Sequence, residues 1–248
     1  MLPKDPRKTA LITGAAGVTG QATAKALMEE GYTVLMADIA ADDLKAKCAS
    51  LGSAAHPVIL DVSRQDQVAE VSASVRQKFG AISVLVNNAG VLSNNKAVET
   101  TLEEWRRILS INLDGAFILA REFLPGMKAM RWGRIVNICS LAMKTGGLTA
   151  GTAYTTSKGG LAALTFSLAR EFASFGVTVN GVSPAYIKTP MITDFLTARQ
   201  QQSLLEQIPV GRFCEPEEVA NVVRFLVSPL SGFITGEIID INGGLQMD

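Results

Sequence analysis

Tyr154 and Lys158 stand four residues apart in the run Ala-Tyr-Thr-Thr-Ser-Lys, which leads into an apolar stretch with helical spacing. On a helix, this spacing places the two side chains on the same face, one turn apart. An ammonium at that distance favours the phenolate over the phenol, so the tyrosine could act as an acid/base near neutral pH. Alone, the pair is weak evidence, because helix surfaces often carry such residues by chance. Its meaning depends on the elements that position it.

Short apolar runs alternate with longer amphipathic segments along the chain, which is typical of β-α-β units. The predicted strands cover residues 9–13, 33–38, 57–60, 82–87, 134–140, 177–182 and 237–241. The predicted helices cover residues 21–30, 42–51, 65–79, 102–130, 152–175 and 216–227. This order predicts one α/β domain over residues 1–248, with a parallel sheet and helices on both faces. The polar segment 189–208 interrupts the alternation and is predicted to form a helical substrate lid.

The composition excludes several classes of function. The chain has 248 residues, 48% of them hydrophobic, so it can bury a large core. Its 23 basic and 23 acidic residues balance without a basic run, which argues against nucleic acid or a membrane as partner and favours a small molecule. Neither a signal peptide nor a membrane span is expected, and three scattered cysteines (Cys48, Cys139, Cys214) favour a cytoplasmic location. The single histidine, His56, is placed in a loop before a strand and excludes a histidine-rich metal site.

The residues after the first two predicted strands indicate a dinucleotide site, because ligands of such sheets bind beyond the carboxyl ends of the strands. Residues 13–20 form a glycine-rich run whose backbone can approach a pyrophosphate at the start of a helix. Asp38 ends the second strand, where a carboxylate can bind both hydroxyls of the adenosine ribose and repels a 2′-phosphate. Residues 39–41 contain no Arg or Lys, so NAD is favoured over NADP. An alternative is that Asp38 only caps the next helix.

Three further motifs follow in order: Asn87-Asn88-Ala89-Gly90 after the fourth strand, Asn112 in the next helix, and Ser140 at the end of the fifth strand. Together with the glycine loop and the Tyr154/Lys158 pair, they make residues 8–247 resemble the short-chain dehydrogenase/reductase family. The resemblance implies a single-domain Rossmann-like fold with a doubly wound, seven-stranded parallel sheet. It also implies an oxidoreductase that transfers a hydride between a nicotinamide cofactor and a carbonyl/alcohol pair.

The resemblance assigns roles residue by residue. Tyr154 is expected to be the acid/base, Lys158 to bind the nicotinamide ribose, and Ser140 to hold the substrate oxygen. Asn112 is expected to keep a water in line with Lys158. Asp61 is expected to contact adenine through its side chain, and Ile187 the nicotinamide carboxamide through its backbone. The expected cofactor-binding residues are Gly14, Gly17, Val18, Thr19, Gly20, Asp38, Asp61, Val62, Asn88, Ala89, Gly90, Tyr154, Lys158, Pro184, Ile187 and Thr189.

Two positions depart from the family pattern. Val18 occupies a place where the common loop has glycine, and Gly17 comes one place earlier, so the turn is expected to be rebuilt around Gly17. This spacing also resembles the extended branch of the family, which includes epimerases, but the extra substrate domain of that branch is missing. Ala185 follows Pro184 where the family usually has glycine, and it would be strained if the backbone there needs a positive φ.

The expected substrate-facing parts are segments 91–96 and 141–149, Tyr186, and the lid over residues 191–205. They mix apolar and neutral polar residues, and Lys144 is a possible anchor for an anion. The preferred prediction is an NAD-dependent dehydrogenase of a secondary alcohol, with a polyol, sugar or hydroxy acid as substrate. The main alternative is an enzyme like the 3-oxoacyl-acyl-carrier-protein reductases, relatives that mostly use NADPH. A further alternative is a cofactor-binding sensor or scaffold without turnover. Relatives usually form tetramers, so a homotetramer is expected, with candidate interface residues Ala162, Ala163, Phe166, Leu168 and Phe172.

Overall fold

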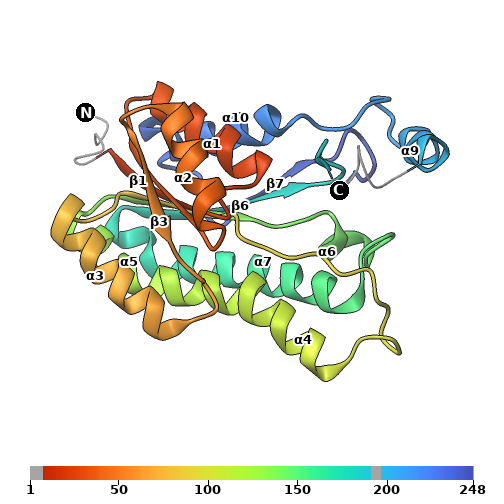
Figure 1. Ribbon diagram of the computed structural model, residues 1–248, viewed down its shortest axis with the longest axis horizontal. Coiled ribbons are helices and arrows are strands. Elements are labelled where there is room, and N and C mark those ends of the chain that lie inside the picture. Colours follow the sequence, from red (N-terminus) through yellow and green to blue (C-terminus); the bar gives the residue numbers. More distant parts are fainter. Residues whose placement is uncertain (1–7, 191–196, 248) are drawn as a thin grey trace.

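A computed structural model describes residues 8–190 and 197–247, which form a sheet of seven strands (Figure 1). The strand order is β3-β2-β1-β4-β5-β6-β7, and all neighbouring strands are parallel. The chain starts mid-sheet, builds outward to β3, returns beside β1 and builds outward again, so the predicted doubly wound fold is confirmed. The strands are β1 (Thr9–Thr13), β2 (Thr33–Asp38), β3 (Ala55–Ile59), β4 (Val84–Asn87), β5 (Gly133–Ile138), β6 (Val177–Pro184) and β7 (Ile238–Ile241).

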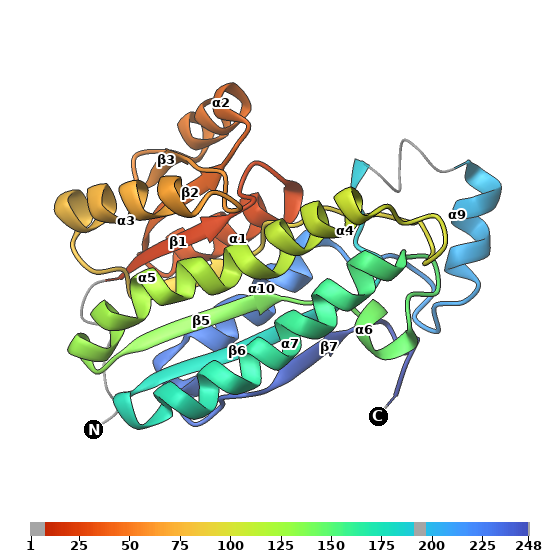
Figure 2. The same ribbon diagram turned by 90° about the horizontal axis from the view of Figure 1, so that it is seen from below.

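Helices cover both faces of the sheet. One face carries α1 (Val18–Glu29), α2 (Ala41–Leu51) and α10 (Pro216–Val227) (Figure 1). On the other face, α3 (Gln65–Phe79), α5 (Gly115–Met130) and α7 (Thr152–Phe172) lie across the strands (Figure 2). The remaining helices of the described residues are α4 (Leu102–Leu109), η1 (Ser110–Asp114), α6 (Ala142–Thr145), η2 (Ala173–Phe175), α9 (Ala198–Leu205) and η3 (Pro229–Ser231).

Side chains of the central strands alternate between two apolar layers. Ala10 and Ile12 of β1 pack in the layer that includes Leu27 of α1 and Val223 of α10. Leu11, between them, packs in the layer on the opposite face. Because both faces are buried, the strands read as continuous apolar runs rather than as alternating ones. This double burial fixes the register of each strand and therefore the position of the residues at its carboxyl end.

The largest difference from the prediction lies in the expected helix 102–130. It is divided into α4, the π-helical turn η1 and α5. A π turn inserts extra residues without ending the helical pattern, so apolar spacing does not reveal it. Asn112 lies in this turn. The other differences are smaller: β5 ends at Ile138, before Ser140, and His56 lies within β3, not in a loop, with its ring 5.0 Å from that of Phe79.

The expected lid, 189–208, is only partly described, because residues 191–196 lie outside the described residues. Helix α9 is capped at its start by Thr197, whose hydroxyl accepts the amide of Gln200. It stands at the same end of the molecule as α6 (Figure 2). Ile208, after α9, is buried. The lid therefore stays a prediction. Within the described residues, no helix is long and apolar enough to cross a membrane.

Candidate active site

The carboxyl ends of β1 and β4 meet where the strand order reverses, which is where ligands of such sheets bind. Asn88 ties these two ends together. Its Nδ2 donates to the carbonyls of Thr13 (2.9 Å) and Gly14 (3.0 Å), and the Thr13 hydroxyl accepts the amides of Asn88 (3.1 Å) and Ala89 (3.0 Å). The segment expected near the adenosine ribose thus also fixes the start of the glycine loop.

The glycine loop is closed by tight backbone contacts. Gly14 has φ +62°, and a Cβ there would lie 2.8 Å from Ala89 Cα. A Cβ on Gly20 would lie 2.6 Å from both Ala15 Cα and Gly14 O, so only glycine allows the helix to approach the loop. The amide of Gly17 donates to Gly14 O at 3.2 Å and Val18 begins α1, as expected for a turn rebuilt around Gly17.

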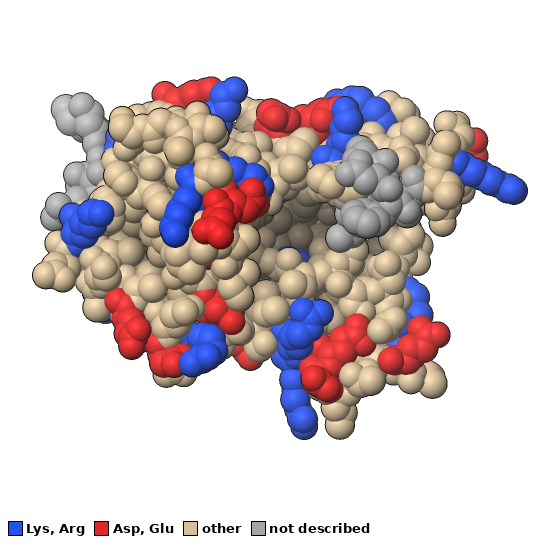
Figure 3. Space-filling view, in the orientation of Figure 1, with Lys and Arg blue, Asp and Glu red and all other residues tan. Residues whose placement is uncertain are grey.

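The loop leads to a free helix N-terminus beside a groove. No side chain of residues 8–190 or 197–247 caps α1, so the first amides of the helix are available to an anion. A groove of about 520 Å³ adjoins it, and its lining includes Val18 and Gln21 from α1 and Thr189 from the segment after β6. The space-filling view is hollowed near its centre (Figure 3). A glycine cradle, a free helix N-terminus and a groove together suit the diphosphate of a dinucleotide.

Asp38 and Lys47 hold Ala16 of the glycine loop from opposite sides. The Asp38 carboxylate accepts the amides of Ala16 (2.9 Å) and Ala40 (3.0 Å). The Ala16 carbonyl accepts from Lys47 Nζ at 2.6 Å, and the same ammonium pairs with Asp43 at 2.6 Å. Sequence reasoning missed Lys47, because its only local signal is the (i, i+4) spacing from Asp43, which is typical of an exposed helix face. A cation therefore does lie at the glycine loop, beside the carboxylate expected to bind the adenosine ribose.

Asp61, expected to contact adenine, is held after β3. Its Oδ1 accepts the amide (2.9 Å) and the hydroxyl (2.7 Å) of Ser63. Neighbouring Val62 is buried and packs closely against Gly115 of α5. The second carboxylate oxygen of Asp61 makes no hydrogen bond within the described part of the chain and can accept one from an adenine amino group.

Asn112 and Lys158 converge on Gly90. A Cβ on Gly90 would lie 3.4 Å from Asn112 Oδ1 and 3.5 Å from Lys158 Nζ. Asn112 is 1% exposed: its Oδ1 accepts the amide of Val91 (2.8 Å), and its Nδ2 donates to Val91 O and Ser157 Oγ (both 3.0 Å). Its side chain is therefore fully used in positioning the segment after β4 against α7.

Lys158 also brings Tyr154 and the end of β5 together. Its buried ammonium donates to the carbonyl of Ile138 at 2.7 Å and lies 5.7 Å from the centroid of the Tyr154 ring. Ser140 follows Ile138 by two residues, and its hydroxyl accepts the amide of Ala142 at 3.2 Å. Between them, burial raises the pKa of the Cys139 thiol to about 11, while the positive charge of Lys158 opposes the shift. The ammonium thus contacts the end of β5, two residues before the serine, and lies near the tyrosine ring.

Comparisons with known proteins agree with this geometry. A family model described as Enoyl-(Acyl carrier protein) reductase matches residues 14–246. The chain is 39% identical, over 96% of its length and 97% of the relative's, to the 3-oxoacyl-[acyl-carrier-protein] reductase FabG of Thermotoga maritima. It is 38% identical, with the same coverage, to the enzyme of that name from Aquifex aeolicus. The chain belongs to the short-chain dehydrogenase/reductase family.

A solved structure supports the same assignment. The short-chain dehydrogenase/reductase from Brucella melitensis described as SDR:Glucose/ribitol dehydrogenase superposes with a TM-score of 0.90 at 35% identity, and 98% of each chain is covered. The prediction of an oxidoreductase is confirmed, and members of this family use a nicotinamide cofactor. The names of the relatives favour the alternative prediction, a 3-oxoacyl-acyl-carrier-protein reductase-like enzyme, over the preferred polyol dehydrogenase. The individual site residues remain predictions.

In this member of the family, the two expected substrate-facing segments are joined. Lys96 Nζ donates to the carbonyls of Gly147 (2.8 Å) and Ala150 (2.7 Å), and the amide of Gly151 donates to Ser93 O at 2.7 Å. Lys144, considered as an anion anchor, instead pairs with Asp240 at 2.6 Å. The apolar side chains of Leu92 and Leu148 are exposed on these segments. The rim therefore suits a substrate that is neutral and partly apolar near its reacting carbon.

The second departure from the family pattern causes no strain. Ala185 is not among the described residues with positive φ, and its amide extends the pairing of β6 with β7 by donating to Ile241 O at 3.0 Å. Pro184 ends β6, and its carbonyl accepts the amide of Leu141 at 3.0 Å. Because the backbone there does not need a positive φ, alanine is accommodated, and the Ala185 amide keeps the segment that leads to Ile187 paired with β7.

Proposed function

We propose that this protein reduces the ketone of a 3-oxoacyl thioester to a secondary alcohol. The observation that carries the proposal is full-length similarity, at 38–39% identity, to reductases whose names specify a 3-oxoacyl group on acyl carrier protein. The apolar rim at Leu92 and Leu148 supports it, because an acyl chain is neutral and apolar. The thioester carrier, acyl carrier protein or coenzyme A, would remain outside the cleft.

The residues present fit a nicotinamide dinucleotide. The cradle of Gly14 and Gly20 and the uncapped start of α1 would hold the diphosphate, and Asp38 and Asp61 would hold the adenosine half. When bound, the nicotinamide supplies or accepts the hydride. Lys158 would bind its ribose, which requires the ammonium to exchange its bond to Ile138 O for bonds to hydroxyls.

The protein's own chemistry is proton transfer to the substrate oxygen. In reduction, the Tyr154 hydroxyl would donate its proton to the ketone oxygen as the carbonyl carbon gains the hydride. The Ser140 hydroxyl, already held near β5 by the amide of Ala142, would donate a hydrogen bond to the same oxygen. The positive charge of Lys158 would favour the phenolate that remains on Tyr154. The buried Asn112 holds the segment at Val91, whose neighbour Gly90 lies against Lys158. The proton would then be replaced from solvent through water.

We further propose that NAD is the preferred cofactor. Asp38 lies where a 2′-phosphate would meet a carboxylate, and both its oxygens already order the backbone of the adenosine site. Lys47 reduces this preference, because its ammonium lies on the neighbouring carbonyl of Ala16. We therefore expect measurable turnover with NADPH as well.

A substrate panel tests the proposal. Acetoacetyl-coenzyme A, as a 3-oxoacyl thioester, should be reduced with loss of NAD(P)H absorbance, and Tyr154→Phe should lose this activity while still binding the cofactor. Oxidation of ribitol or glucose without thioester reduction would favour the second candidate, a polyol or sugar dehydrogenase, which the name of the Brucella melitensis structure supports. Cofactor binding without turnover of any substrate would favour a sensor or scaffold.

We also propose a cytoplasmic homotetramer. The three cysteines are free, which suits a reducing compartment. On α7, Ala162 and Leu168 are buried in the core, but Ala163 and Phe166 are exposed, and Phe166 is 51% exposed. The interface prediction is therefore reduced to the exposed residues, together with the exposed Phe117 on α5. Light scattering after size exclusion should give a tetramer, and Phe166→Glu should give smaller species; a wild-type monomer would contradict the proposal.

A further inference from the structure

The segment that follows β6 is held by a second, parallel segment just before α10. Ile187 forms an isolated parallel bridge with Cys214. The Cys214 amide donates to Tyr186 O at 2.9 Å, and the Lys188 amide donates to Cys214 O at 2.8 Å. These bonds use the carbonyl of Tyr186 and the amide of Lys188. They do not use the N–H and C=O of Ile187 itself.

The free groups of Ile187 face away from Cys214. In an extended chain, successive peptide groups point to opposite sides, so the N–H and C=O of Ile187 point opposite to the bonds made by its neighbours. Within the described residues, neither group makes a hydrogen bond. One donor and one acceptor on one residue match a primary carboxamide, which presents a carbonyl oxygen and an NH₂ group. Thr189, two residues on, lines the groove beside α1.

We infer that the ion pair between Arg212 and Glu218 positions the backbone of Ile187 for binding the nicotinamide carboxamide. The inference rests on the dinucleotide site of the proposed function. Arg212 donates from both terminal nitrogens to the two carboxylate oxygens of Glu218, at 2.6 and 2.8 Å. Such two-pronged pairs fix orientation as well as distance.

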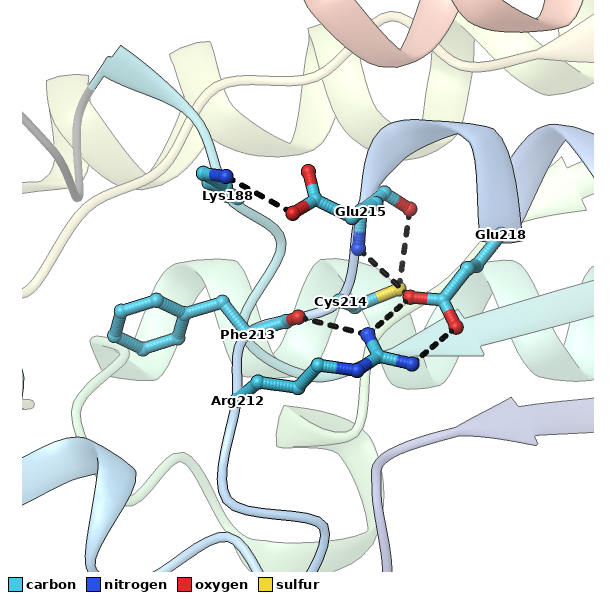
Figure 4. Close-up of polar contacts among 6 residues, drawn as sticks. All are labelled: Lys188, Arg212, Phe213, Cys214, Glu215 and Glu218. Atoms are coloured by element: carbon cyan, nitrogen blue, oxygen red, sulfur yellow. Dashed lines mark hydrogen bonds and ion pairs between the residues drawn. The ribbon is translucent and has the colours of Figure 1, made fainter.

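The ion pair reaches the backbone on both sides of Cys214 (Figure 4). Arg212 Nη1 also donates to Phe213 O at 3.1 Å, and Glu218 Oε2 also accepts the amide of Glu215 at 2.9 Å. The Arg212 hydrogen bond and the Glu215 amide lower the pKa of Glu218 to about 2, so the carboxylate stays ionised at all working pH values. The ion pair thus clamps the chain before the bridging cysteine through Arg212 and after it through Glu218.

The clamp is anchored to the rigid part of the fold. Glu218 lies in the first turn of α10, and the next residue, Val219, is fully buried against the sheet. A second ion pair, between Lys188 and Glu215 at 2.9 Å, joins the two segments directly, but it makes a single contact between exposed groups. The line of contacts therefore runs from α10 through Glu218 and Cys214 to Ile187, without touching the reacting atoms.

Three ligands separate this positioning role from a general structural one. NAD⁺ carries the carboxamide, 3-acetylpyridine adenine dinucleotide replaces it by an acetyl group without N–H donors, and ADP-ribose lacks the ring. Binding of each is measured by titration calorimetry to the whole protein, to Arg212→Met and to Glu218→Gln. Arg76→Met is the matched control, because Arg76 Nη1 likewise contacts both a carbonyl and a carboxylate, Glu122 O at 3.1 Å and Glu122 Oε2 at 3.4 Å, far from the bridge in sequence.

The wild type should bind NAD⁺ more tightly than the acetyl analogue. Arg212→Met and Glu218→Gln should weaken NAD⁺ roughly three- to tenfold, the value of one hydrogen bond, and should reduce its preference over the analogue. ADP-ribose affinity should not change in either variant, and Arg76→Met should match the wild type for all three ligands. Arg212→Lys, which keeps the charge but not both prongs, should fall between.

Several results would overturn the inference. They are a wild type without preference for NAD⁺ over the analogue, a preference fully retained in Arg212→Met, or an equal loss of ADP-ribose binding. If Arg212→Met melts below the assay temperature, Glu218→Gln and Arg212→Lys decide instead. A preference for NAD⁺ over the acetyl analogue that is fully retained in both of them would overturn the inference. A wild type that shows the preference but reduces no substrate would sink only the proposed function and leave the positioning role standing.

Discussion

Replacing Asn112 by leucine should destabilise the fold and remove turnover together. The asparagine is 1% exposed, and its side chain makes three hydrogen bonds, two to the backbone of Val91 and one to Ser157. Leucine has a similar volume but no polar atoms, so the N–H and C=O of Val91 both lose their partner. Val91 leads into the expected substrate segment, and Gly90, just before it, faces Lys158.

The size of the effect follows from these contacts. Each buried polar group left without a partner costs about 1–3 kcal/mol. Val91 is only half-buried, so the lower part of that range applies and the two groups together cost about 2–4 kcal/mol. For a domain of this size, that loss lowers the melting temperature by roughly 4–16 °C.

Two milder variants give a graded series. Ser157→Ala removes the bond from Asn112 and the local bond from the serine hydroxyl to Tyr154 O within α7, and it leaves both bonds to Val91, which costs about 1–2 kcal/mol. Asn112→Asp keeps the acceptor for the Val91 amide but loses both donor contacts and adds a carboxylate near Lys158. Urea unfolding should therefore rank stability as Ser157→Ala, then Asn112→Asp, then Asn112→Leu. If Asn112→Leu proves as stable as Ser157→Ala, the reasoning on Val91 is wrong.

Three further predictions follow from the same contacts. Gly20→Ala should lower the free energy of unfolding by about 1–3 kcal/mol, the usual cost of overpacking, because the new Cβ would lie 2.6 Å from backbone atoms. Gly17→Ala is the control and should melt like the wild type, because its Cβ would meet only Gly14 O, at 3.3 Å. Lys47→Met should lower the ratio of kcat/KM with NADPH to that with NADH about two- to fivefold, the range for an exposed charge, and an unchanged ratio would remove Lys47 from cofactor choice. The pKa of Glu218 is lowered from 4.5 to about 2, so its ion pair stabilises the fold fully above pH 4.5 and is lost as the pH falls toward 2. The difference in melting temperature between the wild type and Glu218→Gln should therefore shrink between pH 4.5 and pH 2. Above pH 4.5 this difference should stay constant.

The central strands were predictable because they are buried on both faces. The bounds of β1 and β2 agree with the prediction residue for residue, as do those of α3 and α10. The edge strand β3 was predicted two residues late, because it starts with Ala55 and His56 and is half-exposed, so its apolar pattern is weak. Helix α9 has no buried residue, so its sequence carries no apolar helical spacing. The helical lid was predicted there only because residues 189–208 interrupt the alternation of strands and helices.

The convergence of the catalytic motifs was also predictable, since residues at the ends of adjacent parallel strands must meet at one edge of the sheet. The π turn that carries Asn112 was not, because apolar spacing continues through it. Contacts between distant segments were missed as well: Lys47 reaches Ala16 across 31 positions, and the Arg212–Glu218 pair acts on Ile187 through an intervening bridge. Such contacts depend on how helices pack on the sheet, which local patterns do not encode.

Cofactor choice shows what such a missed contact changes. On the sequence, Asp38 alone decides against a 2′-phosphate, because no cation follows it. In the fold, one residue of the glycine loop, Ala16, is held at its amide by Asp38 and at its carbonyl by Lys47, so charges of both signs contact the backbone of a single residue. Asp43, paired with the same ammonium, partly neutralises it. Discrimination between NAD and NADP is then a difference between two opposed electrostatic contributions, and it should be smaller and more sensitive to ionic strength than a lone carboxylate would give.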